Sequence, residues 1–209
     1  MAGVLPNSDA AYLKEVQMVS AKETTAILND GRELALAWLT SGQAGDFSEF
    51  LTGMNEADTA HLSLNPHDAG QLERWLSGLE RGELLILAAR DPEKERRLAG
   101  YCALRLGWGA HSHTAQAETF LHPDYRDLGL GSTLIKEAAG VATQRQLDFL
   151  MAEVHVEDRP LMDALKSLGF ELKAVIEDYR VDCSGKPYDV IIMMKRLSYP
   201  SNKEFFYRY

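Results

Sequence analysis

The sequence predicts an α+β protein, because segments of two different periods alternate along its 209 residues. Short apolar runs at residues 84–90 and 147–154 have the length and composition of buried strands. Residues 132–142 instead repeat apolar side chains at the spacing of an amphipathic helix. An Asn-Asp-Gly sequence at residues 29–31, between two strand-like segments, is a strong hairpin signal. Strands and helices are therefore expected to mix along the whole chain.

The first third of this pattern predicts a hairpin followed by two helices. The hairpin arms are residues 24–28 and 33–39, on either side of the turn. Apolar residues at 47–54 recur at helical spacing. A second helix is expected to begin at Asn65, which can cap it and is followed by proline, and to end at Gly82.

The remaining chain is expected to contain six more strands and two more helices. The helices begin at Ser132 and Asp158, and the strands are expected at residues 84–90, 98–106, 114–121, 147–154, 171–181 and 188–194. Together with the hairpin these elements form one domain over residues 24–197, preceded by an extension at residues 1–23. Residues 198–209 form an aromatic tail, which is expected to dock on its own domain or on a second subunit, as in a homodimer.

Composition excludes several classes of function. The hydrophobic share of 45% and charged share of 25% are ordinary for a globular protein, and the formal net charge of −9 disfavours nucleic acid and anionic membranes as partners. The longest apolar run, residues 84–89, is too short to cross a bilayer. Two cysteines, Cys102 and Cys183, suit reduced thiols in the cytoplasm. No spacing of ligands predicts a metal site.

The stretch RDLGLG, residues 126–131, lies where a strand passes into a helix. Gly129 and Gly131 allow the backbone to approach a ligand closely. The first N–H groups of a helix lack intrahelical partners and carry the positive end of its dipole, so this position suits a phosphate or pyrophosphate.

Four interpretations of this loop compete. A dinucleotide fingerprint needs a third glycine where Leu134 stands, and a P-loop needs a lysine where Ser132 stands. The pyrophosphate loop of acetyl-coenzyme A (acetyl-CoA) enzymes, Arg/Gln-x-x-Gly-x-Gly/Ala, matches Arg126, Gly129 and Gly131. For these six residues alone, an ordinary glycine-containing turn without a ligand is the remaining alternative.

The flanking sequence favours the third interpretation. FLHPDYRDLGLGSTLIKEA closely resembles the signature of the GNAT superfamily of N-acetyltransferases, and FLMAEVHVEDRPLMDALKSLGFE looks like that family's next strand, helix and closing Gly-Phe pair. The similarity runs over about residues 84–197, and AEVHVEDRP and ILNDGRELAL also resemble the branch that acetylates protein lysines. The resemblance implies a GNAT-type central sheet, mixed but mostly antiparallel, with helices on both faces.

The resemblance also implies an activity and a set of site residues. An acetyl group would pass from acetyl-CoA to a primary amine of a small molecule, a protein lysine or a protein N-terminus by direct attack, with no metal. The alternative is a non-catalytic acyl-CoA-binding sensor or scaffold.

The resemblance also implies which residues hold the cofactor. The main chain from Arg126 to Gly131 would hold the pyrophosphate, with Ser132 at the helix start. The residues concerned are Arg126, Asp127, Leu128, Gly129, Leu130, Gly131 and Ser132.

The catalytic strand would supply the other groups. By similarity, the pantetheine arm pairs along Thr119, Phe120 and Leu121, where the strand splays from its neighbour, and the Leu121 N–H polarises the thioester carbonyl. Glu118 is the expected general base, with His122 as the second choice. Leu165 stands where many relatives carry a tyrosine acid, so no acid is assigned. Asp158 stands where relatives often carry an asparagine that touches the cofactor.

Overall fold

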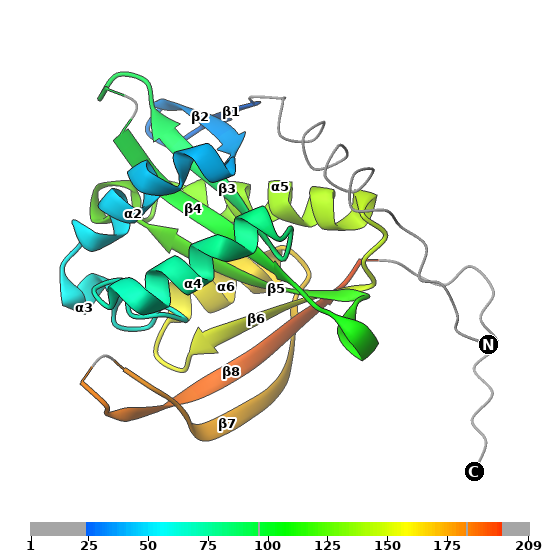
Figure 1. Cartoon of the computed structure of the whole chain (residues 1–209). Coiled ribbons are helices and arrows are strands. Elements are labelled where there is room, and N and C mark those ends of the chain that lie inside the picture. Colours follow the sequence, from blue (N-terminus) through cyan, green and yellow to red (C-terminus); the bar gives the residue numbers. More distant parts are fainter. Residues whose placement is uncertain (1–23, 96, 183, 198–209) are drawn as a thin grey trace, which may run out of the picture.

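The strands of the computed structural model form one mixed sheet in the order β1-β2-β3-β4-β5-β6-β8-β7 (Figure 1). The structure describes residues 24–95, 97–182 and 184–197, so the predicted extension, the aromatic tail and Cys183 lie outside it. Neighbouring strands are antiparallel except for the parallel pair β5–β6. The strands are β1 Thr24–Ile27, β2 Glu33–Trp38, β3 Leu84–Asp91, β4 Arg97–Leu106, β5 Thr114–Leu121, β6 Phe149–His155, β7 Glu171–Val181 and β8 Pro187–Arg196. The α+β class and the mostly antiparallel sheet are confirmed.

Helices cover both faces of this sheet. In Figure 1, α2 and α4 lie in front of the strands, and α5 and α6 lie behind them. Their bounds, with the short helices between them, are η1 Ser41–Gln43, α2 Ala44–Thr52, α3 Glu56–Thr59, α4 Ala69–Glu80, η2 Gly109–His111, η3 Pro123–Tyr125, α5 Leu130–Gln144 and α6 Arg159–Ser167. Within the described ranges, no helix is long and apolar enough to cross a membrane.

Strand β4 shows how one strand serves two cores. Tyr101 and Ala103 pack on the face covered by α2 and α4, whereas Cys102 and Leu104 pack on the face covered by α5 and α6. This alternation follows from the two-residue period of a strand. It makes β4 almost wholly apolar, as expected for a strand buried on both faces.

The sequence placed most elements within a few residues of their bounds, but α5 begins at Leu130 instead of Ser132, the short helix α3 was not predicted, and the predicted start of α4 was wrong. The hairpin forms as predicted, with β1 and β2 paired from Thr24 and Leu36 to Ile27 and Glu33. Helix α4 begins at Ala69 instead of near Asn65, because Asp68 caps it by accepting the N–H groups of Gly70 and Gln71 at 3.0 and 3.1 Å.

Gly100 lets strand β4 approach the end of β5. It pairs with Leu121, and the register of β3 against β4 shifts beside it, between Ala89 and Arg90. A Cβ on Gly100 would lie 2.7 Å from both the Leu121 Cδ2 and the Phe120 carbonyl oxygen. The close packing of these strands therefore requires glycine at this position.

We expect the substitution Gly100→Ala to lower the free energy of unfolding by about 1–3 kcal/mol, the usual cost of overpacking a core. Urea denaturation monitored by circular dichroism measures this change. Gly45→Ala is the matched control, because a Cβ there meets nothing within 4 Å, and helical alanine is favoured over glycine. Equal stability of the two variants would contradict the packing argument.

Candidate active site

The glycine loop between η3 and α5 presents unpaired main-chain donors. Asp127 and Gly129 adopt left-handed conformations, with φ of 61° and 83°, and Gly129 is the N-cap of α5. The first N–H groups of such a helix have no intrahelical acceptor. The Thr133 N–H donates to the Gly129 carbonyl at 3.2 Å. The N–H groups of the turn before Thr133 therefore point away from the helix at its start. Such a start binds phosphate groups well.

The β1–β2 hairpin turn packs against this loop and forms hydrogen bonds with it. The Asn29 N–H donates to the Leu128 carbonyl at 3.0 Å, and a Cβ on Gly129 would lie 3.2 Å from the Asn29 Oδ1. Arg32 donates to the Asp124 carbonyl at 3.3 Å and lies 4.8 Å above the ring centroid of Tyr125. The loop conformation is therefore held by a segment almost a hundred residues earlier in the chain.

Tyr125 anchors the same region in the core. Its hydroxyl donates to the Asp91 Oδ2 at 2.6 Å. Burial, together with this hydrogen bond to a carboxylate, raises the pKa of Tyr125 to about 12, so the ring remains a neutral donor. Tyr125 therefore gives the chain a rigid support just before the glycines.

Arg126 uses its side chain to join three segments. A guanidinium nitrogen contacts the Asp58 Oδ1 at 2.7 Å, and Nε donates to the Leu121 carbonyl at 3.3 Å. The side chain thereby links α3, the end of β5 and the glycine loop. The Arg126 N–H itself donates to the Pro123 carbonyl at 3.3 Å, so the arginine of the loop pattern has a positioning role here through its side chain.

Strands β5 and β6 separate at the point where the resemblance predicted a splay. Their parallel pairing ends at Ala117 and Ala152, although the strands continue to Leu121 and His155. The His122 N–H donates to the Ala99 carbonyl at 2.9 Å on the other side. Main-chain groups alternate in direction along an antiparallel ladder, so those of Leu121 and Thr119 face away from β4, toward the split.

Phe120 differs from the two residues beside it. The same alternation directs its main-chain groups toward Tyr101 of β4, with which it pairs. Its side chain is buried in the core beneath α2 and α4. Of the three residues predicted to pair with a pantetheine arm, Thr119 and Leu121 are therefore available, and Phe120 is not.

Glu118 stands at the mouth of the split, one residue beyond the last pair of β5 and β6. Its carboxylate accepts the Ser63 N–H at 2.7 Å and the Tyr101 hydroxyl at 3.3 Å. Burial, followed by the charge of Glu118, raises the pKa of Tyr101 well above its ordinary value, so Tyr101 stays a donor. The carboxylate is thus held in place while some of its lone pairs remain available.

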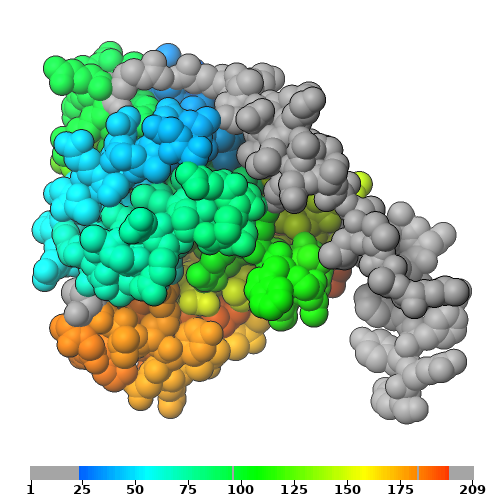
Figure 2. Space-filling view, in the orientation of Figure 1, coloured from blue at the N-terminus to red at the C-terminus, as the bar shows by residue number. Residues whose placement is uncertain are grey.

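Glu153 occupies the matching position on β6, and sequence analysis missed it. It follows Ala152, and it lies on the same face as Glu118 because Ala152 and Val154 point into the opposite core. Its carboxylate contacts Arg180 of β7 at 3.5 Å. Figure 2 shows a few yellow atoms of the chain around β6 between the teal helix α4 and the orange strands β7 and β8.

The structure disfavours His122 as a base. Its Nε2 lies 2.7 Å from a guanidinium nitrogen of Arg97 and its Nδ1 lies 3.2 Å from the Asp124 main-chain nitrogen, and the neutral ring can accept a hydrogen bond at only one of these two positions. Burial, followed by the charge of Arg97, lowers the pKa of His122. A ring so occupied and only 8% exposed serves as the N-cap of η3 and is poorly placed to take a proton from a substrate.

Two further predicted site residues have structural roles in the fold. The Asp158 carboxylate accepts the Leu161 N–H at 3.1 Å and caps α6, so it has a structural role at the start of that helix. Leu165 is 1% exposed and belongs to the core between the sheet and α6. The described part of the chain contains no cluster of three or more metal-ligating side chains.

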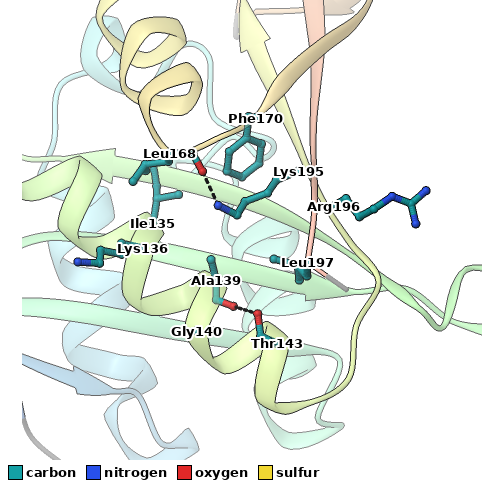
Figure 3. A pocket seen from close by; sticks show the side chains of 10 residues that line it. All are labelled: Ile135, Lys136, Ala139, Gly140, Thr143, Leu168, Phe170, Lys195, Arg196 and Leu197. Carbon is teal, nitrogen blue, oxygen red and sulfur yellow. Dashed lines mark hydrogen bonds between the residues drawn. The ribbon is translucent and has the colours of Figure 1, made fainter. Parts of the chain in front are cut away.

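Two concave regions lie away from the loop and the split. The pocket in Figure 3, of about 240 Å³, runs along the middle and C-terminal part of α5, and Figure 3 shows Lys195 directed toward the Leu168 carbonyl inside it. A second pocket, of about 480 Å³, lies between α2 and α4. Neither is lined by a predicted site residue, and we assign no ligand to them.

A helix start with unpaired donors, beside a parallel strand pair that splits, is the arrangement that the resemblance to an acyltransferase family predicted. The model of the acetyltransferase (GNAT) family matches residues 51–170, more than half of the chain, and the protein belongs to that family.

Individual relatives are more distant. A protein of Bacillus subtilis (strain 168), provisionally named a ribosomal protein bS18-alanine N-acetyltransferase, is 29% identical over 101 residues, which are 48% of this chain. The chain spans 63% of the length of that relative.

Solved structures share the fold. A provisionally assigned acetyltransferase from Acinetobacter baylyi ADP1 matches with a TM-score of 0.67 and 18% identity, over 87% of this chain and 98% of that one. The yncA protein of Salmonella typhimurium, provisionally an acetyltransferase and solved with acetyl-CoA, matches with a TM-score of 0.65 and 17% identity, over 82% of this chain and 98% of that one. At this identity the likeness concerns the fold.

Proposed function

We propose that the protein transfers the acetyl group of acetyl-CoA to a primary amine, carried by a small molecule or by a protein lysine or N-terminus. The observation that carries this proposal is the split between β5 and β6, with the Leu121 N–H facing it beside the donors of the glycine loop. Membership of the GNAT family supports the choice of an acetyl donor.

The residues present fit a coenzyme A diphosphate. The left-handed Gly129 bends the chain so that the first turn of α5 presents N–H donors, and a Cβ on Gly131 would meet only Leu121 Cδ1, at 3.5 Å. Main-chain donors at a helix start stabilise phosphate charge without a lysine. The Arg126 side chain, engaged with Asp58, keeps the loop against the end of β5.

The transfer needs few groups from the protein. The amine nitrogen attacks the thioester carbon, a C–N bond forms, the C–S bond breaks, and the amine proton passes to a carboxylate. The Leu121 N–H is placed to stabilise the developing oxyanion, a contribution that is typically about 3 kcal/mol. The thiolate can leave unaided and take a proton from solvent, because a thiol pKa is near 8.5.

Glu118 remains the proposed base, and the structure adds Glu153 as its competitor. The amine arrives mostly as ammonium, with a pKa of about 10.4 for a lysine, so a carboxylate must accept a proton before or during attack. Glu118 and Glu153 each follow the last β5–β6 pair by one residue, and their side chains lie on the same face of the sheet. Glu153 contacts the guanidinium of Arg180 at 3.5 Å, whereas Glu118 accepts hydrogen bonds from neutral donors.

Incubation with acetyl-CoA and a panel of small amines and short peptides tests this function. We expect thiol release, followed with a thiol reagent, and an acetylated product in mass spectrometry for at least one acceptor. Acceptor-free reactions control for hydrolysis. Tight binding of coenzyme A in calorimetry without turnover of any acceptor would contradict the enzyme and favour the acyl-CoA sensor.

A further inference from the structure

Three rings from distant parts of the chain meet beside the split. His61 follows α3, His155 ends β6, and Tyr188 lies in β8. The ring centroids of His61 and His155 are 4.2 Å apart, and Tyr188 lies 5.0 Å from the first and 4.9 Å from the second. We call these three residues the ring cluster.

Neighbouring contacts place the ring cluster at the mouth of the split. Leu62, next to His61, accepts a hydrogen bond from Arg180 at 3.0 Å, and the following Ser63 donates to Glu118. The same Arg180 contacts Glu153, two residues before His155. The segment that carries His61 therefore arches over the face on which both candidate carboxylates lie.

The charges around the ring cluster are mostly negative. Those that act on His61 or Tyr188, apart from the imidazole of His155, are the carboxylates of Glu118, Glu153, Asp158 and Asp182 and the guanidinium of Arg180. Carboxylates outnumber the cation, and ring faces carry a negative potential. The surroundings thus favour a positively charged group.

Burial favours the uncharged forms of His61 and Tyr188. Burial, followed by the charge of His155, lowers the pKa of His61. The His155 Nδ1 accepts the Glu157 N–H at 3.1 Å, so its ring proton lies on Nε2 in the neutral form. Burial raises the pKa of Tyr188, which keeps the phenol uncharged. His61 and Tyr188 therefore contribute uncharged aromatic rings to the cluster beside the split.

We propose that His61, His155 and Tyr188 form a recognition surface for the acceptor as an organic cation, which is held at the ring faces before it loses its proton to a carboxylate at the split. The inference rests on the proposed function and deepens it, because it selects cationic amines over neutral nucleophiles. Neutral rings attract such cations within about 6 Å of their centroids.

Acidification should weaken this recognition. When His61 takes up a proton at low pH, its cationic ring repels a cationic acceptor. Affinity for a permanent cation is therefore expected to be highest near pH 7.5 and to fall by about tenfold at pH 5. A permanent cation is needed as a probe because its own charge does not change with pH.

The experiment uses choline as the cation and 3,3-dimethyl-1-butanol as its neutral isostere. The full chain, saturated with coenzyme A, is titrated with each while the histidine ring resonances are followed by NMR. We expect choline to shift the His61 and His155 resonances in a saturable manner, and the neutral alcohol to bind at least about tenfold more weakly. Equal affinity for the two probes, or no shift at these rings, would overturn the proposal.

Three variants show whether the aromatic rings are responsible. Tyr188→Phe keeps the ring and should retain choline binding, whereas Tyr188→Leu should lose most of it. His61→Leu, at an exposed position, provides a second test if Tyr188→Leu fails to fold. Unchanged choline affinity in the folded leucine variants would contradict the inference. Because the readout is cation binding and not turnover, its failure is distinguishable from a failure to acetylate any amine.

Discussion

Replacing Gly129 with valine is expected to abolish coenzyme A binding while leaving the rest of the domain folded. The glycine has φ of 83°, a conformation that β-branched residues essentially do not adopt, and a Cβ there would also crowd the Asn29 Oδ1 at 3.2 Å. Relaxing this strain, which costs about 1–3 kcal/mol, requires the loop to turn its first helical N–H groups elsewhere. Calorimetry should show at least a hundredfold loss of affinity, roughly 2.7 kcal/mol.

Gly140→Ala is the matched control for this substitution. Gly140 lies in the same helix α5, and a Cβ there meets nothing within 4 Å. It should leave coenzyme A affinity unchanged and raise the free energy of unfolding by about 0.5–1 kcal/mol, as glycine-to-alanine changes inside helices do. If a folded Gly129→Val protein bound coenzyme A as tightly as the Gly140→Ala control, the glycine loop would not be the diphosphate site.

Replacing Glu118 with glutamine is expected to reduce kcat by about 10²–10⁴-fold, the usual contribution of a positioned general base. The amide is isosteric with the carboxylate and keeps an oxygen for the Ser63 N–H, so the segment carrying His61 stays in place. Coenzyme A affinity should not change, because Glu118 contacts neither the glycine loop nor α5. Initial rates with the best acceptor of the panel, measured from pH 6 to pH 10, provide the test.

Glu153→Gln separates the two carboxylates at the split. It removes the charge that faces Arg180 and should raise KM for a cationic acceptor while changing kcat much less than Glu118→Gln does. A large loss of kcat confined to Glu153→Gln would instead assign the proton transfer to Glu153 and contradict the role of Glu118.

Features that depend on residues close together in the sequence could be predicted without the structure. The period of apolar residues predicted the strands and the long helices, and the Asn-Asp-Gly turn predicted the first hairpin, which the structure confirms. Gly129 was singled out for close backbone approach, and it does adopt a left-handed conformation at the start of α5. The error at Asn65 arose because two capping residues, Asn65 and Asp68, compete within one turn.

Residues whose role depends on partners far away in the chain could not be assigned in this way. His122 appeared available as a base because its sequence position does not reveal Arg97, which the antiparallel pairing of β4 and β5 brings to its ring. Glu153 was overlooked for the converse reason, since only the register of β5 against β6 places it opposite Glu118. Glu153 lies one residue beyond the last residue of β6 that pairs with β5, and this position would have identified it. The sequence does not show where strand pairing ends.

The sequence by itself determined the period of each segment, the bend at the glycines and the class of ligand that a helix start can hold. These properties depend on residues within a few positions of one another, where steric limits on φ and ψ and side-chain spacing decide the outcome. The tertiary structure alone decided which carboxylates flank the split, which rings face them and which histidine is already occupied. Those relations join residues far apart in the chain, such as Arg180 and Leu62, which are separated by 118 residues, and strand order and register set them.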